Sequence, residues 1–231
     1  MIHFDRVVKR YPNGREALSN VSFEIAPGEM VFLTGRSGAG KSTLLKLIAL
    51  IERPTRGVLT VNGHNTGTLA ARDVPAFRRQ IGVVFQDHRL LVDQPVFDNV
   101  ALPLVVAGLA LKEIDKRVRA ALDQVGLLDK ERLLPLELSV GEQQRVGIAR
   151  AVVSKPAVLI ADEPTGNLDH GLALDVMRLF RRFQEVGVTV VVATHDLPLV
   201  HEFGQREIVV ENGQIARIGE PPTPPTLQAM R

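Results

Sequence analysis

The chain has 231 residues, of which 45% are hydrophobic and 23% are charged, and its 28 Lys and Arg residues against 26 Asp and Glu leave a net charge of +2. This apolar fraction excludes an intrinsically disordered chain, and the small net charge gives no electrostatic reason to expect a nucleic-acid partner. The lack of cysteine excludes a disulfide framework, a thiolate metal site and a cysteine nucleophile.

The start of the chain and its longest apolar run predict where the protein works. The first six residues have neither the basic start nor the apolar core of a secretory signal. The apolar run 100–111 contains Pro103 and Gly108 and is much shorter than the about 20 residues that span a bilayer. We therefore expect a cytoplasmic protein that reaches the inner face of the cell membrane only through a partner.

The first third of the chain has the patterns of strands. Residues 21–25 and 58–61 alternate apolar and polar side chains, and Asn62-Gly63 ends the second segment with a pair that favours tight turns. Other segments are almost continuously apolar, as are strands buried on both faces of a parallel sheet. These segments are 30–34, 157–161 and 188–193. Because a helical pattern follows each of them, the sequence predicts an α/β fold with a mainly parallel central sheet.

The later parts of the chain have other patterns. Residues 112–127 place apolar side chains at spacings of three and four, as an amphipathic helix does, and no strand pattern is present between 87 and 151. Residues 208–211 and 214–218 flank Asn212-Gly213, which predicts a hairpin.

These patterns predict a single domain over residues 1–219. Its core comprises residues 1–86 and 152–219 and includes an N-terminal antiparallel β subdomain. Residues 87–151 form a helical subdomain inserted into that core. The Pro-rich segment 220–231 is expected to be a flexible tail.

One glycine-rich segment has a phosphate-binding pattern. It follows the apolar strand 30–34, precedes a helix expected over 41–51, and fits G-x-x-x-x-G-K-[ST]. Glycines let backbone N–H groups turn toward phosphate oxygens, and the helix start directs its positive dipole end at the same anion. The lysine bridges the outer phosphates, and the serine hydroxyl binds Mg²⁺. The expected nucleotide-binding residues here are Gly35, Arg36, Ser37, Gly38, Ala39, Gly40, Lys41, Ser42 and Thr43.

A pair of acidic residues ends the apolar strand 157–161. Adjacent residues at a strand end face opposite sides, so Asp162 and Glu163 can take separate roles. We expect Asp162 in the Mg²⁺ shell and Glu163 as the base that accepts a proton from an attacking water.

Further motifs occur in the order typical of one family. Residues 138–145 read Leu-Ser-Val-Gly-Glu-Gln-Gln-Arg, residues 166–169 read Gly-Asn-Leu-Asp, and Gln86, His195 and Tyr11 stand at characteristic places around them. Together with the phosphate loop, this series resembles the ABC-type ATPases over residues 1–219. The resemblance implies the P-loop ABC ATPase fold, hydrolysis of ATP to ADP and phosphate, and ATP and Mg²⁺ as cofactors.

The resemblance also implies a role for each motif residue. Tyr11 would stack on adenine, and Gln86 and His195 would act with Glu163 in catalysis. The metal ligands would be Ser42, Gln86 and Asp162. The signature residues Ser139, Gly141 and Glu142 would complete the ATP site of a second chain, and Asp169 would lie at the contact between the two chains. One phosphate loop and one signature per chain therefore imply an ATP-dependent homodimer.

The signature motif departs from the family pattern at one position, because most members have glycine where this chain has Val140. Valine disfavours a positive φ, so we expect ordinary backbone geometry there. We expect function to be kept with altered turnover, because the valine side chain narrows the approach to Ser139.

Several stretches are similar to the cell-division branch of the family. They are residues 85–91, 96–100, 164–169 and 187–196. This similarity implies an FtsX-like integral membrane partner, possible contact with division-ring proteins, and an ATP cycle that regulates cell-wall hydrolysis. Part of the surface 96–111 would receive a helix of the membrane partner, unless its apolar residues are core of the helical subdomain.

Two other functions remain open from the sequence. Relatives that drive lipoprotein release or macrolide export share the form of residues 164–169. A scaffold that is gated by ATP, with incidental hydrolysis, would need the same nucleotide site. A GTPase is disfavoured, because the chain has no Asn-Lys-x-Asp motif for reading guanine.

Overall fold

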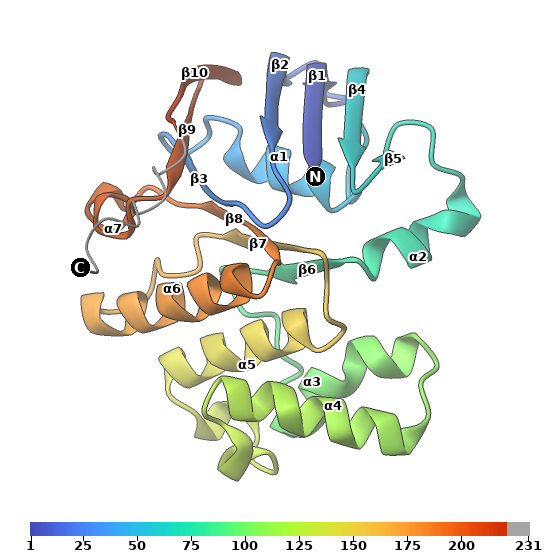
Figure 1. Ribbon diagram of the computed structural model, residues 1–231, viewed down its shortest axis with the longest axis vertical. Coiled ribbons are helices and arrows are strands. Elements are labelled where there is room, and N and C mark those ends of the chain that lie inside the picture. Colours follow the sequence, from blue (N-terminus) through green and yellow to red (C-terminus); the bar gives the residue numbers. More distant parts are fainter. Residues whose placement is uncertain (221–231) are drawn as a thin grey trace, which may run out of the picture.

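A six-stranded sheet runs through the centre of the computed structural model, which describes residues 1–220 (Figure 1). Its order is β10-β9-β3-β8-β7-β6, and the strands are parallel except for β10, which forms an antiparallel hairpin with β9. The strands are β3 (Met30–Thr34), β6 (Ile81–Val84), β7 (Val158–Asp162), β8 (Thr189–Ala193), β9 (Arg206–Glu211) and β10 (Gln214–Ile218).

A four-stranded antiparallel sheet lies above the central sheet in Figure 1, and helix α1 (Lys41–Ile48) contacts both sheets. Its order is β2-β1-β4-β5. Asn62 and Gly63 join β4 to β5 with φ of 47° and 79°, the positive values that a tight hairpin turn needs. The strands are β1 (Ile2–Arg10), β2 (Glu16–Ile25), β4 (Arg56–Val61) and β5 (His64–Asn65).

The central strands are apolar on both faces because both faces are covered. In β3, Phe32 packs into the hydrophobic cluster on the side of the helices between residues 96 and 185, whereas Val31 and Leu33 pack into the cluster that contains α1. Strands β7 and β8 alternate between the two clusters in the same way. Continuous apolar runs in the sequence thus correspond to strands inside a layered α/β fold.

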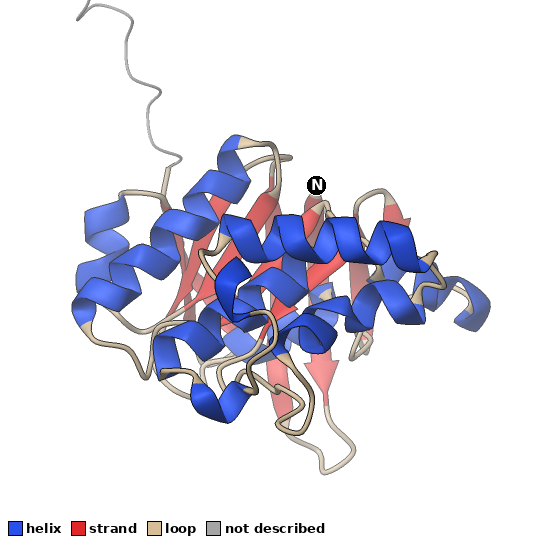
Figure 2. Ribbon diagram, turned by 90° about the horizontal axis from the view of Figure 1, so that it is seen from below, coloured by secondary structure: helices blue, strands red, loops and turns tan. Residues whose placement is uncertain are grey.

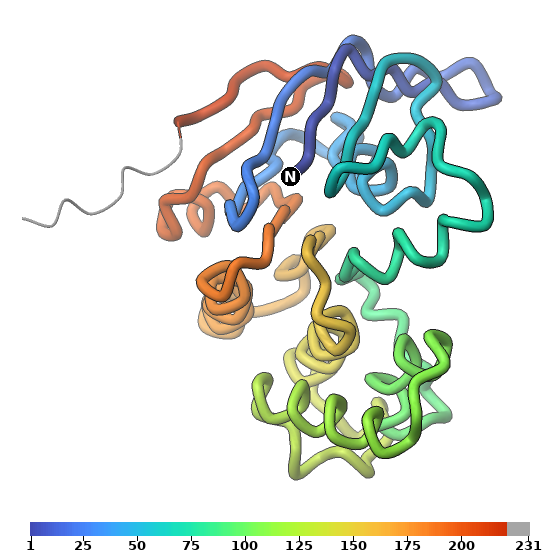
Figure 3. The backbone as a smooth tube through the Cα atoms, turned by 45° about the vertical axis from the view of Figure 1, so that its right-hand side comes forward, coloured from blue at the N-terminus to red at the C-terminus, as the bar shows by residue number. Residues whose placement is uncertain are grey.

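The helices between residues 96 and 185 cover the face of the central sheet opposite to the antiparallel sheet (Figures 1 and 2). In Figure 3, the green and yellow helices α3, α4 and α5 form a group below both sheets. The α-helices after α1 are α2 (Val74–Arg78), α3 (Val96–Val106), α4 (Leu111–Gln124), α5 (Val140–Val152), α6 (His170–Glu185) and α7 (Leu197–Phe203). Short 3₁₀ turns are η1 (Ala71–Asp73), η2 (Leu128–Lys130) and η3 (Pro135–Glu137).

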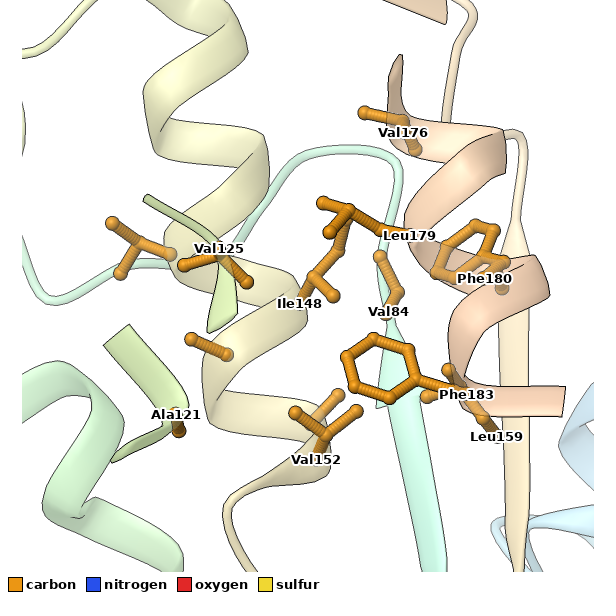
Figure 4. Close-up of a cluster of buried hydrophobic side chains, with 14 of the residues drawn as sticks. Val84, Ala121, Val125, Ile148, Val152, Leu159, Val176, Leu179, Phe180 and Phe183 are labelled. Atoms are coloured by element: carbon orange, nitrogen blue, oxygen red, sulfur yellow. The ribbon is translucent and has the colours of Figure 1, made fainter. Parts of the chain in front are cut away.

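One hydrophobic cluster joins this helical group to the central sheet. Figure 4 shows Ile148 of α5, Val84 of β6 and Phe183 of α6 pointing toward one another. All three side chains are buried. Helix α5 is therefore part of the same hydrophobic core as the central sheet.

The structure confirms the expected fold class, with a mainly parallel central sheet, an N-terminal antiparallel sheet and a helical insertion. Residues 87–151 contain helices and loops and no strand, and Asn212-Gly213 joins the expected hairpin. Two helices end earlier than their sequence patterns: α1 ends at Ile48, and α4 ends at Gln124, shortly before Gly126 with φ of 70°.

The expected division into subdomains stays a prediction, because one hydrophobic cluster runs across its boundary. The expected tail, apart from its first residue Glu220, lies outside the described residues. No helix among residues 1–220 combines the length and the apolar composition needed to cross a membrane.

Candidate active site

The carboxyl ends of the parallel strands bring distant motifs together. The phosphate loop follows β3, Gln86 follows β6, the acid pair Asp162–Glu163 ends β7, and His195 follows β8. Asp162 is in register with Ala193 of β8, so the acid pair and the segment leading to His195 emerge side by side. In open parallel sheets this edge is where ligands bind.

Two glycines let the phosphate loop lie tightly against its neighbours. Gly35 passes so close to β9 that a Cβ would be 2.1 Å from the carbonyl oxygen of Val210. Gly40 has φ of 119°, and a Cβ there would be 2.9 Å from Leu18 Cδ2 in β2. Any larger residue at either position would push the loop away from the two sheets that hold it.

Helix α1 begins without a side-chain cap. Its N-cap is Gly40, so no side chain satisfies the N–H groups of the first turn, which includes Lys41, Ser42 and Thr43. No acidic residue occupies that turn either. The free N–H groups and the positive end of the helix dipole form an anion site at the mouth of the loop.

Lys41 is folded back into this loop. Its side chain is buried, and Nζ donates a hydrogen bond of 2.7 Å to the carbonyl oxygen of Gly35. Nζ also lies 3.5 Å from Glu163 Oε1. A buried ammonium whose partners are carbonyl oxygens and one carboxylate is positioned to receive a polyphosphate.

Glu163 connects the lysine to the histidine. Its second oxygen, Oε2, lies 2.9 Å from Nδ1 of His195, and its own side chain is largely buried. The backbone of Glu163 has φ of 48°, which is unusual for a residue with a Cβ. Strain of this kind persists where surrounding structure holds a side chain in a required direction.

Asp162 lies beside Glu163 in an environment that disfavours its charge. Burial raises the pKa of the Asp162 carboxyl, and the neighbouring charge of Glu163 raises it further. A hydrogen bond from Ser42 and the charge of Lys41 oppose this rise in pKa without cancelling it. A carboxylate in this position gains from a bound cation.

These groups open into one cavity of about 790 Å³. Gly35 is the one expected nucleotide-binding residue outside its lining, and it lines the adjoining cavity of about 950 Å³ instead. The expected residues that line the first cavity are Tyr11, Arg36, Ser37, Gly38, Ala39, Gly40, Lys41, Ser42, Thr43, Gln86, Asp162, Glu163 and His195. Its size is in the range of small-molecule sites.

Three lining residues were not found from the sequence: Arg15, Ala17 and Lys46. Pro12-Asn13-Gly14 is a turn signal that could have placed Arg15 near Tyr11, because the turn reverses the chain between them. Lys46 lies four residues after Ser42 and hence on the same face of α1.

The signature residues and Asp169 lie outside this cavity. Ser139 is the N-cap of α5: its hydroxyl oxygen accepts a hydrogen bond from the Glu142 N–H, and the Glu142 carboxylate accepts one from the Ser139 N–H, which forms a capping box. Asp169 caps α6 by accepting a hydrogen bond of 3.0 Å from the Leu172 N–H. A Cβ on Gly141 would be 3.1 Å from Leu172 Cδ1, so the starts of α5 and α6 lie against each other.

The segment after Gln86 is tied to the far end of α5. His88 and Arg89 have φ of 54° and 48°, and the Arg150 guanidinium donates hydrogen bonds to both of their carbonyl oxygens, at 2.5 and 2.7 Å. Helix α5 therefore carries the signature turn, residues 139–142, at its start, and near its end it holds the segment that follows Gln86.

The donor set suits a hard cation. Ser42, Gln86 and Asp162 supply hydroxyl, amide and carboxylate oxygens around the same cavity, and Mg²⁺ prefers oxygen ligands together with substrate phosphates. No group of three His, Cys, Asp or Glu side chains within residues 1–220 could hold a metal by itself.

Comparison with known proteins places these observations in a family. The family model described as ABC transporter matches residues 18–166. The cell division ATP-binding protein FtsE of Escherichia coli strain K12 is 58% identical over 215 residues, which cover 93% of this chain and 97% of the relative. The protein of the same name from Bacillus subtilis strain 168 is 48% identical, over 94% of this chain and 95% of the relative.

The fold is also similar to solved structures. The dimeric bacterial ABC transporter cassette MJ0796 superposes with a TM-score of 0.87 at 36% identity, covering 95% of this chain and 98% of that chain. A dimeric post-hydrolysis state of the same cassette, bound to ADP and Pi, gives a TM-score of 0.86 at 35% identity over the same shares of the two chains.

Proposed function

This chain belongs to the ABC transporter family, and from that membership we propose that it is the ATP-binding and ATP-hydrolysing subunit of a membrane complex in bacterial cell division. Identity of 58% over 93% of the chain to a cell division ATP-binding protein carries the cellular part of the proposal. The contacts of Glu163 with Lys41 and His195 in one cavity carry the enzymatic part.

The proposed reaction is in-line attack of water on the γ-phosphate of ATP. Lys41 and the open start of α1 bind the phosphates, and Tyr11 stacks on the adenine. Glu163 accepts the proton of the attacking water, and His195 holds Glu163 through its Nδ1 contact and faces the γ-phosphate. Ser42, Gln86 and Asp162 would hold Mg²⁺, which would neutralise charge on the phosphate oxygens.

The proposed active form is a homodimer. Ser139, Gly141 and Glu142 lie outside the cavity of their own chain, so they are free to complete the site of a second chain. Dimeric cassettes of the same fold support this arrangement. In this proposal Asp169 lies at the contact between the two chains. Two copies related by a two-fold axis would form two complete ATP sites.

Glu163→Gln tests the enzymatic proposal. It keeps the shape of the side chain and removes the base, so we expect phosphate release to fall at least about 100-fold while ATP still drives dimerisation. Phosphate release and light scattering with and without ATP measure the two effects. Hydrolysis at the wild-type rate would refute Glu163 as the base.

The proposed membrane partner is an FtsX-like integral membrane protein, which would hold this subunit at the inner face of the cell membrane. Each of the two interpretations of the surface 96–111 holds for part of it, because some of its apolar residues are core and others are exposed. Val100 and Leu104 are buried core, whereas Val105 and Val106 are 56% and 77% exposed. Leu102 is also exposed, so it forms with Val105 and Val106 an apolar face of α3 that is open to a partner helix, and Leu111 is exposed at the start of α4.

Val106→Asp tests this surface, and Val186→Asp is the matched control. Val186 is 79% exposed, and it lies at the end of α6, outside the helical group. We expect Val106→Asp to abolish co-purification of the membrane partner after crosslinking in native membranes while nucleotide binding is unchanged. Val186→Asp should leave both co-purification and nucleotide binding unchanged. Mass spectrometry identifies the partner, and recovery of a lipoprotein-handling complex in place of an FtsX-like protein would refute the cell-division assignment.

The relatives from Escherichia coli and Bacillus subtilis bear the cell-division name, so we do not propose lipoprotein release or macrolide export as the function. An ATP-gated scaffold with incidental hydrolysis predicts that Glu163→Gln supports division as well as the wild-type chain does. Loss of complementation by Glu163→Gln in a depleted strain would exclude that alternative.

A further inference from the structure

The signature turn contains a carboxylate with two separate partners. The Ser139 N–H donates a hydrogen bond of 3.0 Å to Glu142 Oε2, which is the capping-box contact. The ammonium of Lys130, the last residue of η2, donates to the other oxygen, Oε1. Both oxygens of Glu142 are therefore engaged, one within the turn and one from a neighbouring segment.

This ion pair is more sheltered than an ordinary surface pair. The side chain of Glu142 is 17% exposed and that of Lys130 is 33% exposed. The hydrogen bond from Lys130 lowers the pKa of the Glu142 carboxyl, with the Ser139 backbone N–H as the next contribution. Glu142 is consequently ionised at neutral pH, and its charge lies in the first turn of α5.

A carboxylate at this place is unfavourable if the turn faces a triphosphate. Two like charges a few ångströms apart repel, by about 1 kcal/mol in water and by more where water is excluded. A capping box tolerates Gln in place of Glu, so the fold of the turn does not itself require the charge. Lys130 supplies the opposite charge directly beside it.

We propose that Lys130 is a positioning residue of the signature turn: it neutralises Glu142 and holds it against Ser139, so that the turn can approach the triphosphate of ATP bound to a second copy of this chain. This inference rests on the proposed function, because it requires ATP at the interface of two chains. It assigns Lys130 a role in ATP-driven dimerisation, while nucleotide binding to the single chain is independent of it.

Lys130→Met in the full-length chain tests this assignment. We expect ATP-driven dimerisation, followed by light scattering in the Glu163→Gln background, to weaken about fivefold, which is the size of one partly screened charge-assisted contact. Binding of a fluorescent ATP analogue to the single chain stays unchanged. At about 0.5 M salt the defect shrinks in part, because salt screens the repulsion of a partly exposed charge less fully than that of a surface charge.

A second substitution separates charge balance from mere packing. In Lys130→Met combined with Glu142→Gln, the unbalanced charge is gone, and we expect dimerisation to recover to within about twofold of Glu142→Gln alone. Arg117→Met is the matched control, because Arg117 is 34% exposed and pairs with Glu113 within α4. That variant should dimerise normally.

The outcomes distinguish the two levels of the argument. If wild-type and Glu163→Gln chains do not dimerise with ATP, the proposed function fails. If they dimerise and Lys130→Met does so equally well, or if its defect is unchanged by Glu142→Gln and by salt, the assignment of Lys130 is wrong. Lys130→Gln removes the charge with a smaller change of packing, so it replaces Lys130→Met if melting shows that the latter is unfolded.

Discussion

The starts of helices α1 and α5, to which the proposed function assigns the two sides of the ATP site, are built differently. The N-cap of α1 is Gly40, which offers no side-chain cap, and Lys41 is buried beneath the loop. The N-cap of α5 is Ser139, whose hydroxyl and N–H are both engaged by Glu142. The first start leaves its N–H groups for a ligand, whereas the second satisfies its own groups until a ligand arrives.

This difference matches what each helix start can do in a single chain. The start of α1 opens into the cavity of about 790 Å³, beside Asp162 at the end of β7 and Glu163 directly after it. The start of α5 lies outside that cavity, where an unsatisfied helix end would cost stability in the free chain. The distance from the Glu142 nitrogen to Ser139 Oγ is 3.3 Å, and the hydroxyl oxygen is the acceptor in this contact, so its own O–H can still donate to a phosphate oxygen.

We call the part of the ATP site around the start of α1 the α1 half, and the part around the start of α5 the α5 half. The largest effect that we predict falls on the α1 half. Lys41→Met removes the buried ammonium and leaves Glu163 without its positive neighbour, so hydrolysis should fall at least about 1000-fold and ATP-driven dimerisation should be lost. Phosphate release and light scattering measure these effects. Lys46→Met is the control, because Lys46 lines the same cavity but is exposed. An equal loss in both variants would contradict the special place of Lys41.

The second prediction tests whether the two halves act on different chains. Ser139→Phe blocks the α5 half, and we expect this variant, like Lys41→Met, to be inactive by itself. A mixed dimer of the two variants has one site that combines an intact α1 half with an intact α5 half. An equimolar mixture should therefore recover about a quarter of wild-type hydrolysis. No recovery would contradict independent sites formed between chains.

The same contrast explains which features could be predicted from the sequence. Local patterns in which each residue type has a direct physical reason predicted the phosphate loop, the buried strands and both Asn-Gly turns. Strand β1 escaped because its alternation shifts: Ile2 and Phe4 are buried, then Val7 and Lys9, with Arg6 at φ of 48° between them. The register changes there, so no period of two runs through the strand.

Contacts between distant segments could not be predicted in this way. Arg150 binds the carbonyl oxygens of His88 and Arg89, and Lys130 binds Glu142, yet neither pair has a pattern in the sequence. Strand β6 is short and contains Gly82, where a Cβ would be 2.4 Å from the Ala151 carbonyl oxygen of α5. Such closeness depends on how the helical insertion packs, which a single sequence does not display.

A smaller effect is expected from Asp162→Asn, measured as stability without Mg²⁺. The folded chain raises the pKa of this carboxyl, so the ionised form costs stability at neutral pH. The cost is absent below the ordinary pKa of aspartate and grows as pH rises through the raised value. The variant should melt about 2 °C higher than wild type at pH 7, and the difference should disappear near pH 3.

Magnesium supplies the control for this prediction. Mg²⁺ with ATP should stabilise the wild-type chain more than Asp162→Asn, and hydrolysis by the variant should be lost. Equal stabilisation of both chains by Mg²⁺ would contradict Asp162 as a ligand. A stable but inactive variant would show that the α1 half keeps an unfavourable charge for its function.

The smallest effect concerns Val140, the first residue of α5. Its backbone is helical and its side chain is 49% exposed, so the structure confirms the expected ordinary geometry and shows no contact that requires valine. Val140→Gly should lower the free energy of unfolding by less than about 1 kcal/mol, through helix propensity alone.

Because Val140 stands beside Ser139 on the face that a second chain would approach, we expect Val140→Gly to raise hydrolysis by no more than about threefold, with the ATP affinity of the single chain unchanged. Stopped-flow phosphate release and nucleotide titration separate these quantities. If both stay at wild-type values, Val140 has no part in the α5 half of the site, and the departure from glycine is neutral.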